Sequence, residues 1–333
     1  MSQSRRNVIQ GIGVGVAAQL TAGEAQAQGA AKAEVWSGEY WAHKGDVKLS
    51  MFRKRLGAPQ AGQAPLPVLF LVHGSSISAR PSFDLTVPGK GEYSVMDAFA
   101  RFGFDVWTMD HENYGRSSRT SGNSDIASGV EDLKAGIEVV ARETGWPKVH
   151  MMGESSGAIR AGAYAMARSD RVDRLVLSAF TYKGEGSPTL AKRAEQLAYF
   201  RAHNMRLRDR AMILSIATRD KPGTSDIAVM NALADEELKF GDQCPTGTYL
   251  DMTANLPLVD PKKVHSPVLL VRGEYDGIAT VDDIYAFFKD LPNGDRQFVI
   301  LPDIAHSLVL GKNRQLFWHA MHAFLAMPAP VAT

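Results

Sequence analysis

Two kinds of hydrophobic pattern alternate along the chain between residues 34 and 325. Short apolar runs bounded by turn residues are typical of strands, and stretches with an apolar residue at every third or fourth position are typical of helices. The apolar runs predict strands over residues 34–40, 47–53, 68–72, 104–109, 149–152, 174–178, 268–271 and 297–301. The second pattern predicts helices over residues 94–102, 124–143, 158–168, 281–291 and 313–325.

The order of these elements indicates the fold class. Residues 68–72 read Val-Leu-Phe-Leu-Val, which is typical of a strand that is buried on both faces. Parallel strands joined by helices place those helices on the two faces of one sheet. We therefore expect an α/β fold with a mostly parallel central sheet and helices on both faces. Residues 34–40 and 47–53, separated by a turn at Gly45, predict a hairpin.

The pattern changes between residues 181 and 260. This segment is mostly helical in pattern and rich in charge, and the strand–helix alternation resumes after it. An insertion at one connection leaves the sheet intact on either side of it. We therefore assign residues 28–180 and 261–333 to the core and residues 181–260 to a helical cap over the active site.

The first 27 residues form a separate segment that is expected to direct export. Arg5 and Arg6 are a twin-arginine pair, residues 8–20 are mildly apolar, and residues 25–27 read Ala-Gln-Ala. This order resembles a bacterial twin-arginine signal with cleavage after residue 27. The apolar part is shorter than the about 20 residues that cross a bilayer, so we expect no stable membrane insertion. The mature protein would begin near Gln28 and act in the periplasm or outside the cell. A plain Ala/Gln-rich N-terminus is the alternative.

Composition narrows the class of protein. The chain has 333 residues, of which 45% are hydrophobic and 22% charged, and its formal net charge is +1. This is an ordinary globular composition, and near-neutral charge gives no electrostatic basis for binding nucleic acid. Cys244 is the only cysteine, which excludes a disulfide within the chain and a cysteine-rich metal site. We expect neither a metal nor a cofactor.

Residues 153–157 read Gly-Glu-Ser-Ser-Gly and match the Gly-x-Ser-x-Gly pattern of a nucleophile elbow. An elbow places its serine on a sharp turn between a strand and a helix. Predicted strand 149–152 precedes the motif and predicted helix 158–168 follows it. A side chain at either glycine would collide with a neighbouring strand or helix. A plain turn of small residues is the alternative, but this context favours Ser155 as a nucleophile.

A serine hydroxyl needs a base to remove its proton and an acid to orient that base. His306 lies in the segment Pro-Asp-Ile-Ala-His-Ser that immediately follows predicted strand 297–301. The carboxyl ends of parallel strands are where such a sheet carries its chemistry, so we expect His306 to be the base. Four other histidines are poorly placed for this role: His203, His265, His319 and His322.

The acid is expected after the preceding strand. Asp276 follows predicted strand 268–271 and stands 30 positions before His306. The triad order along the chain is then serine, aspartate, histidine. Glu274 and Asp303 are the alternatives for the acid.

Backbone amides that face the reacting carbonyl would stabilise its negative charge. We expect one from Ser156, directly after the nucleophile, and one from Ser75, in the loop after strand 68–72. Ser76 is the fallback for the second amide. Gly74 allows this loop to turn inward, and His73 is expected to brace it rather than to react.

Taken together, these motifs resemble the α/β-hydrolase superfamily. The resemblance covers residues 34–325 and includes residues 110–117, Asp-His-Glu-Asn-Tyr-Gly-Arg-Ser, which are similar to the family's D-x-x-G-x-G-x-S turn. Asn113 stands where a glycine is usual, and asparagine tolerates the left-handed backbone. The resemblance implies an α/β-hydrolase fold in a capped, esterase- or lipase-like member. We expect Ser76 and Tyr114 at the substrate pocket.

The leading hypothesis is a secreted serine hydrolase that cleaves a carboxylic ester of a small molecule through an acyl-enzyme. The same triad serves amidases, thioesterases, lactonases and C–C bond hydrolases, because a fold does not fix the substrate. A non-catalytic binding protein on a hydrolase fold is the alternative from another class.

Basic residues gather in the first part of the predicted cap. A solvated helix face explains them without any function. Alternatively, one or two of these cations line the pocket entrance and favour an ester that carries a carboxylate. The residues are Lys183, Lys192, Arg193, Arg201, Arg206, Arg208 and Arg210.

Overall fold

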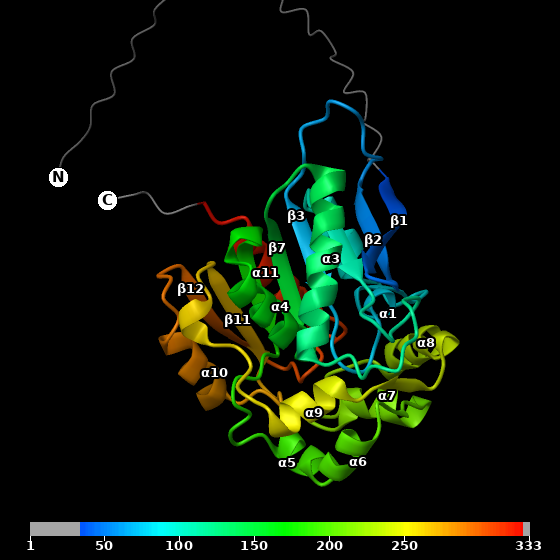
Figure 1. Cartoon of the computed structure of the whole chain (residues 1–333), viewed down its shortest axis with the longest axis vertical. Coiled ribbons are helices and arrows are strands. Elements are labelled where there is room, and N and C mark those ends of the chain that lie inside the picture. Colours follow the sequence, from blue (N-terminus) through cyan, green and yellow to red (C-terminus); the bar gives the residue numbers. More distant parts are fainter. Residues whose placement is uncertain (1–33, 329–333) are drawn as a thin grey trace, which may run out of the picture. The chain divides into compact units, whose positions relative to one another are not determined.

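An eight-stranded sheet runs through residues 34–328, the part of the chain that the computed structural model describes (Figure 1). The β1–β2 and β2–β6 pairs are antiparallel, and all pairs from β6 to β12 are parallel. The mostly parallel α/β sheet predicted from the sequence is therefore confirmed. In order across the sheet, the strands are β1 (Val35–Lys44), β2 (Val47–Leu56), β6 (Asp105–Met109), β3 (Val68–Val72), β7 (Val149–Glu154), β8 (Val172–Ser178), β11 (Val268–Gly273) and β12 (Arg296–Leu301).

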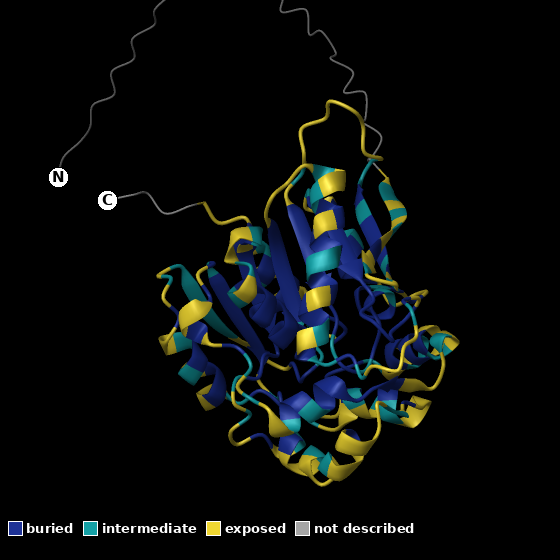
Figure 2. Ribbon diagram, in the orientation of Figure 1, coloured by how far each residue is buried: buried dark blue, intermediate teal, exposed yellow. Residues whose placement is uncertain are grey.

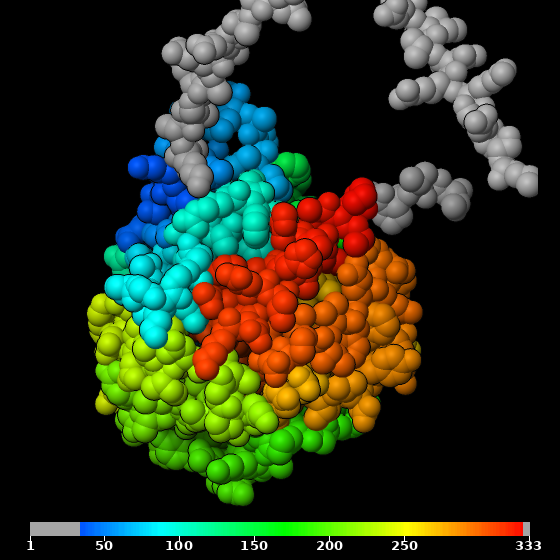
Figure 3. Space-filling view, turned by 180° about the vertical axis from the view of Figure 1, so that it is seen from behind, coloured from blue at the N-terminus to red at the C-terminus, as the bar shows by residue number. Residues whose placement is uncertain are grey.

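Helices cover both faces of the sheet, which leaves its central strands buried (Figure 2). On β3, Phe70 belongs to the apolar cluster that contains α3, α4 and α10, whereas Leu69 and Leu71 belong to the cluster that contains α2 and α11. Seen from behind, α11 (red) lies on this second face (Figure 3). The helices are α2 (Val95–Arg101), α3 (Ile126–Thr144), α4 (Ser156–Ala167), α10 (Val281–Lys289) and α11 (Arg314–Leu325).

The helical cap lies between β8 and β11 in the chain, beside the carboxyl ends of the parallel strands (Figure 1). Three of its helices begin at a residue whose side chain accepts a backbone amide of the first turn, namely Ser187, Asp209 and Asp226. The cap comprises α5 (Pro188–Ala194), α6 (Leu197–Ala202), α7 (Arg210–Thr218), α8 (Ile227–Glu237), α9 (Gly247–Ala254) and the antiparallel pair β9 (Met205–Leu207) and β10 (Gln243–Pro245).

Several short elements have no counterpart in the sequence pattern. They hold three to five residues each, which is too short for a hydrophobic period, and tertiary contacts fix them. Lys54, for example, forms ion pairs with Asp84 at 2.5 Å and Asp97 at 2.7 Å. The elements are α1 (Ala79–Phe83), the hairpin β4 (Asp84–Thr86) and β5 (Glu92–Ser94), and 3₁₀ turns at Ser169–Arg171, Leu238–Phe240 and Pro261–Lys263.

The expected export signal, residues 1–27, lies outside the described residues. Within residues 34–328, no helix has both the length and the apolar character needed to cross a membrane. The same part of the chain contains no group of three or more His, Cys, Asp or Glu side chains arranged to hold a metal ion.

Candidate active site

Ser155 occupies a sharp turn between β7 and α4. Its backbone is left-handed, with φ +59° and ψ −125°, which costs energy for a residue other than glycine. A Cβ at Gly153 would overlap the carbonyl of Gly157, and a Cβ at Gly157 would overlap the carbonyl of Val72. Both glycines are therefore needed for β7, α4 and the end of β3 to meet at this point, as expected for an elbow.

A chain of hydrogen bonds joins the three residues that the sequence selected. The Nε2 atom of His306 lies 2.9 Å from Oγ of Ser155, and its Nδ1 atom lies 2.9 Å from Oδ1 of Asp276. The three residues follow the ends of β7, β11 and β12. Parallel strands end at one edge of the sheet, which is why residues 151 positions apart in sequence meet here.

Asp276 is held as a buried, ionised carboxylate. Burial alone would raise its pKa, but the neighbouring His306, together with the backbone amides of Ile278 and Ala279, holds the pKa below its ordinary value. These amides donate to Oδ1 at 2.8 and 3.2 Å. An ionised Asp276 keeps the proton of His306 on Nδ1, so Nε2 is free to accept the proton of Ser155.

The alternative acids face away from this chain of hydrogen bonds. Glu274 and Asp303 are exposed, and an oxygen of Glu274 accepts the amide of Asp303 at 3.0 Å. Among the other histidines, His203, His265 and His319 are exposed and His322 stacks on Phe102.

The loop after β3 lies against the nucleophile. A Cβ built on Gly74 would be 3.4 Å from the Cβ of Ser155, and the hydroxyl of Ser75 donates to the hydroxyl of Ser156 at 2.8 Å. Within the described part of the chain, no acceptor is found for the backbone amides of Ser75 and Ser156. Ser156 begins α4, where amides have no partner inside the helix. Two unoccupied donors therefore flank Ser155.

His73 and Tyr114 hold this loop in place through hydrogen bonds to its backbone. Nε2 of His73 accepts the amide of His111 at 3.1 Å, so its Nδ1 donates to the carbonyl of Gly74 at 2.8 Å. Burial lowers the pKa of His73 well below its ordinary value and keeps it neutral. Tyr114 is buried and donates to the carbonyl of Ser75 at 2.7 Å. Tyr114 therefore supports the loop. It does not line either cavity at the site, so the expectation that Tyr114 lies at the substrate pocket is wrong.

Asn113 adopts the left-handed backbone that its position requires, with φ +69°. Its side chain accepts the amide of Thr120 at 2.7 Å and donates to the carbonyl of Gly122 at 2.7 Å. Because these bonds secure the side chain, asparagine replaces the usual glycine without loss of the turn.

Glu154 is a functional candidate that the sequence analysis did not single out. Its carboxylate accepts the amides of Leu308 at 3.1 Å and Val309 at 3.5 Å, just after His306. Burial raises the pKa of Glu154 to about 7. Glu154 thus ties the elbow to the histidine loop. The contact spans 154 positions, and no local pattern signals it.

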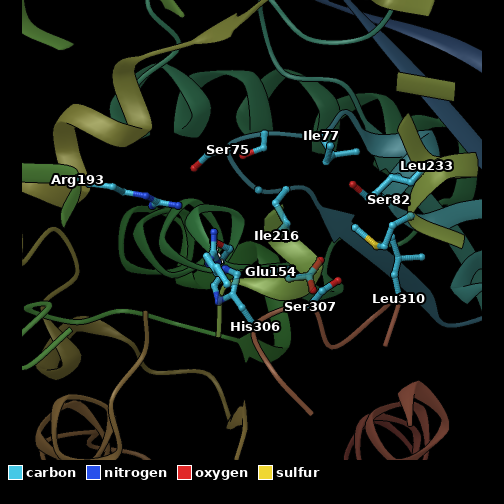
Figure 4. Close-up of a pocket in the computed structure, with 15 residues that line it drawn as sticks. Ser75, Ile77, Ser82, Glu154, Arg193, Ile216, Leu233, His306, Ser307 and Leu310 are labelled. Atoms are coloured by element: carbon cyan, nitrogen blue, oxygen red, sulfur yellow. Dashed lines mark hydrogen bonds between the residues drawn. The ribbon is translucent and has the colours of Figure 1, made fainter. Parts of the chain in front are cut away.

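Two adjoining cavities lie between the candidate triad and the cap. The first, of about 70 Å³, is lined by Ser155 and His306 together with a set of apolar side chains (Figure 4). The second, of about 530 Å³, lies against the cap and includes Tyr249 and Tyr275. The apolar set of the first cavity is Ile77, Ile216, Met230, Leu233 and Leu310. The residues common to both linings are Ser76, Arg193, Ile216 and Arg219.

Two charged residues of the cap, Glu237 and Arg208, form hydrogen bonds to the loop after β3. Glu237 accepts the amide and the hydroxyl of Ser78 at 2.9 and 2.5 Å and pairs with Arg208. Arg208 also donates to the carbonyl of Ser76 at 3.3 Å. Burial raises the pKa of Glu237 to about 7 in spite of Arg208. This contact fixes the cap relative to the amides beside Ser155.

The fold is shared with several solved hydrolases. An enol-lactonase from Burkholderia xenovorans superposes with a TM-score of 0.61 at 15% identity, over 86% of this chain and 100% of that one. A 2-hydroxy-6-oxo-6-phenylhexa-2,4-dienoate hydrolase from a Rhodococcus strain gives 0.59 at 18%, over 88% and 100%. An esterase from Thermogutta terrifontis gives 0.60 at 17%, over 86% and 98%. At such identities the likeness shows the fold.

A comparison with curated protein sequences finds no significant match. A family model described as "Serine aminopeptidase, S33" matches residues 88–313, which is more than half of the chain. This match spans the elbow, the acid, the histidine and the whole cap. The chain therefore belongs to the serine aminopeptidase S33 family of the α/β-hydrolase superfamily.

Proposed function

We propose that the protein is a serine hydrolase that cleaves a carboxylic ester of a small molecule through an acyl-enzyme. The observation that carries this proposal is the bonded chain from Ser155 through His306 to buried Asp276, beside two unoccupied amides. Such a chain activates a hydroxyl only when base and acid are both in reach, and here both distances are 2.9 Å.

The geometry supports the following sequence of events. Oγ of Ser155 attacks the ester carbonyl while Nε2 of His306 takes its proton, and the amides of Ser75 and Ser156 stabilise the oxyanion. The tetrahedral intermediate collapses, and His306 gives the proton to the leaving alcohol. Water, deprotonated by His306, then attacks the acyl-enzyme and releases the acid. Asp276 stabilises the protonated imidazole in both halves.

The charge around the larger cavity supports an ester over a peptide with a free amino terminus. An aminopeptidase must hold the ammonium group of its substrate, which requires acidic groups. The lining here includes Lys192, Arg193, Arg206 and Arg219, and Asp220 is its acidic residue. These cations would repel an ammonium group. A lactone, the substrate class in the name of one of the solved structures, and a C–C bond are alternatives for the same triad.

A substrate screen tests the proposal. Purified protein is assayed with p-nitrophenyl esters of increasing chain length and with p-nitroanilides, each beside the Ser155→Ala variant. We expect turnover of the short esters, because the pocket at Ser155 holds about 70 Å³. Turnover of anilides alone would show an amidase. A folded protein without turnover of any substrate would support a binding protein.

We also propose that residues 1–27 direct export by the twin-arginine route, on the strength of Arg5, Arg6 and the Ala-Gln-Ala sequence. The mature chain would then begin near Gln28, which N-terminal sequencing of periplasmic material can check. Arg5→Lys combined with Arg6→Lys should retain the protein in the cytoplasm, whereas normal export of this double variant would rule the route out.

A further inference from the structure

The larger cavity has an excess of positive charge that the proposed reaction does not use. Within the described residues, its lining carries four basic side chains and one acidic one. Asp220 lies 3.3 Å from Nε of Arg219 and so offsets one of the four. The basic residues are Lys192, Arg193, Arg206 and Arg219.

Arg193 stands out among these cations because it is partly buried and forms no ion pair within residues 34–328. Its Nη1 atom is inaccessible to solvent and has no hydrogen-bond partner in residues 34–328. Burial lowers the pKa of Arg193 to about 10, so the group is still charged at neutral pH. A guanidinium donor that neither water nor the protein reaches is costly, and an acceptor on a bound ligand would remove this cost.

The position of Arg193 connects this charge to the reaction. Arg193 belongs to the linings of both cavities, and its guanidinium points toward His306 and Ser75 across the pocket (Figure 4). An anionic group bound by Arg193 would therefore belong to the same molecule whose ester bond lies at Ser155.

Aromatic contacts hold two of the guanidinium groups in place. The ring of Tyr249 lies 5.0 Å from the guanidinium carbon of Arg193 and 4.6 Å from that of Arg206. The hydroxyl of Tyr249 bonds to the hydroxyl of Ser76 at 2.6 Å, which fixes the ring. Cations positioned before the ligand arrives lose little freedom when they bind it.

Three of the other cations of the basic run are placed differently. Arg208 is neutralised by Glu237 inside the protein, and Arg210 pairs with Asp235 on the surface. Arg201 is exposed on α6 and lines neither cavity. The excess charge is therefore a property of the cavity and not of the whole cap surface.

We propose that the enzyme selects esters that carry a carboxylate, and that Arg193 binds this carboxylate with the support of Arg206 and Arg219. One end of the ester occupies the pocket at Ser155 and the anionic end occupies the larger cavity. A guanidinium presents two parallel donors that match a carboxylate, which makes arginine the suitable residue. This inference rests on the proposed ester hydrolysis and names its substrate class.

Two matched pairs of substrates test the inference. The first pair, 4-acetoxybenzoate and its methyl ester, carries the charge on the alcohol side, and the second, monomethyl and dimethyl glutarate, carries it on the acyl side. In at least one pair, kcat/KM for the charged member should exceed that for the neutral member by about 10- to 100-fold. Raising the ionic strength should reduce this ratio.

Substitutions locate the effect. The ratio should fall to near one in Arg193→Gln and to an intermediate value in Arg193→Lys, which keeps the charge but loses the paired donors. Arg201→Gln, a change of the same kind outside both cavities, should leave the ratio as in wild type. A ratio that survives in Arg193→Gln would overturn the assignment of this residue.

A binding measurement separates this inference from the proposed function. Glutarate should raise the melting temperature of the wild-type protein and not that of Arg193→Gln, and inorganic phosphate should raise it less. If neutral and charged esters were turned over equally well and glutarate did not bind, the carboxylate site would be overturned and the proposed esterase activity would stand. If glutarate bound but no ester was turned over, the carboxylate site would be supported and the proposed esterase activity would be overturned.

Discussion

Polar side chains have different partners in two parts of the site, which we call the floor and the roof. On the floor, made by loops after the parallel strands, Ser155, His306 and Asp276 are bonded to one another and Glu154 is bonded to the histidine loop. On the roof, made by the cap, Arg208 is neutralised by Glu237, whereas Arg193 forms no ion pair within residues 34–328. The floor is preorganised for one reaction, and the roof has binding capacity left for a substrate.

The largest expected effect concerns the floor. Ser155→Ala and His306→Ala should each reduce kcat for a p-nitrophenyl ester by about 10⁴-fold or more, because the members of a triad act as one unit. Circular dichroism and thermal unfolding should show that both variants are folded. His319→Ala, at an exposed position on α11, is the matched control and should retain full activity. Substantial turnover by a folded Ser155→Ala protein would exclude the mechanism.

Asp276, the acid of the triad, should contribute nearly as much to kcat as Ser155 and His306. Asp276→Asn should reduce kcat by about 10³- to 10⁴-fold, because an amide favours the wrong tautomer of His306. Glu274→Gln changes an exposed side chain and should have little effect. If steady-state kinetics showed the larger loss for Glu274→Gln, the acid would be misassigned.

Two arginines of the roof sharpen the comparison. Arg208→Met leaves Glu237 buried without its partner and should lower the free energy of unfolding by about 3–5 kcal/mol. Arg193→Met removes a cation that has no counter-ion, so its stability should lie within about 1 kcal/mol of wild type. Urea unfolding measures both. Equal losses would mean that Arg193 is a structural residue.

The smallest effect concerns Glu154 and appears as a dependence of stability on pH. Its pKa is raised from 4.5 to about 7 in the folded protein, so the folded state holds this proton more tightly than the unfolded state. The free energy of unfolding should therefore fall as the pH rises from about 5 to 8. In Glu154→Gln, the free energy of unfolding should decrease over this pH range by up to about 3 kcal/mol less than in wild type. Identical pH profiles for both proteins would argue against the raised pKa.

The sequence predicted the floor because its geometry follows from strand order. Apolar runs located the parallel strands, and residues in the loops after three of them, including Ser155 and His306, had to meet at one edge. The short helix α1 and the hairpin of β4 and β5 had no pattern long enough to detect. Tyr114 was expected at the pocket, but the side on which its ring packs depends on the loop above it.

The roof could not be predicted in the same way. Arg193 and Arg208 belong to one basic run, and their sequence contexts do not distinguish a paired cation from an unpaired one. Their different environments arise when the cap folds, since Glu237 at the end of α8 reaches Arg208 and no carboxylate forms an ion pair with Arg193 on α5. The run therefore justified two open hypotheses, and only the packing of the described cap helices distinguishes between them.

Active-site labelling identifies the nucleophile. The protein is treated with a fluorophosphonate, digested and examined by mass spectrometry, beside the His306→Ala variant. We expect one adduct per chain, on Ser155, formed at the rate at which ester hydrolysis is lost, and much slower labelling without His306. An adduct on another residue, or hydrolysis that continues after Ser155 is fully labelled, would contradict the assignment of Ser155 as the nucleophile.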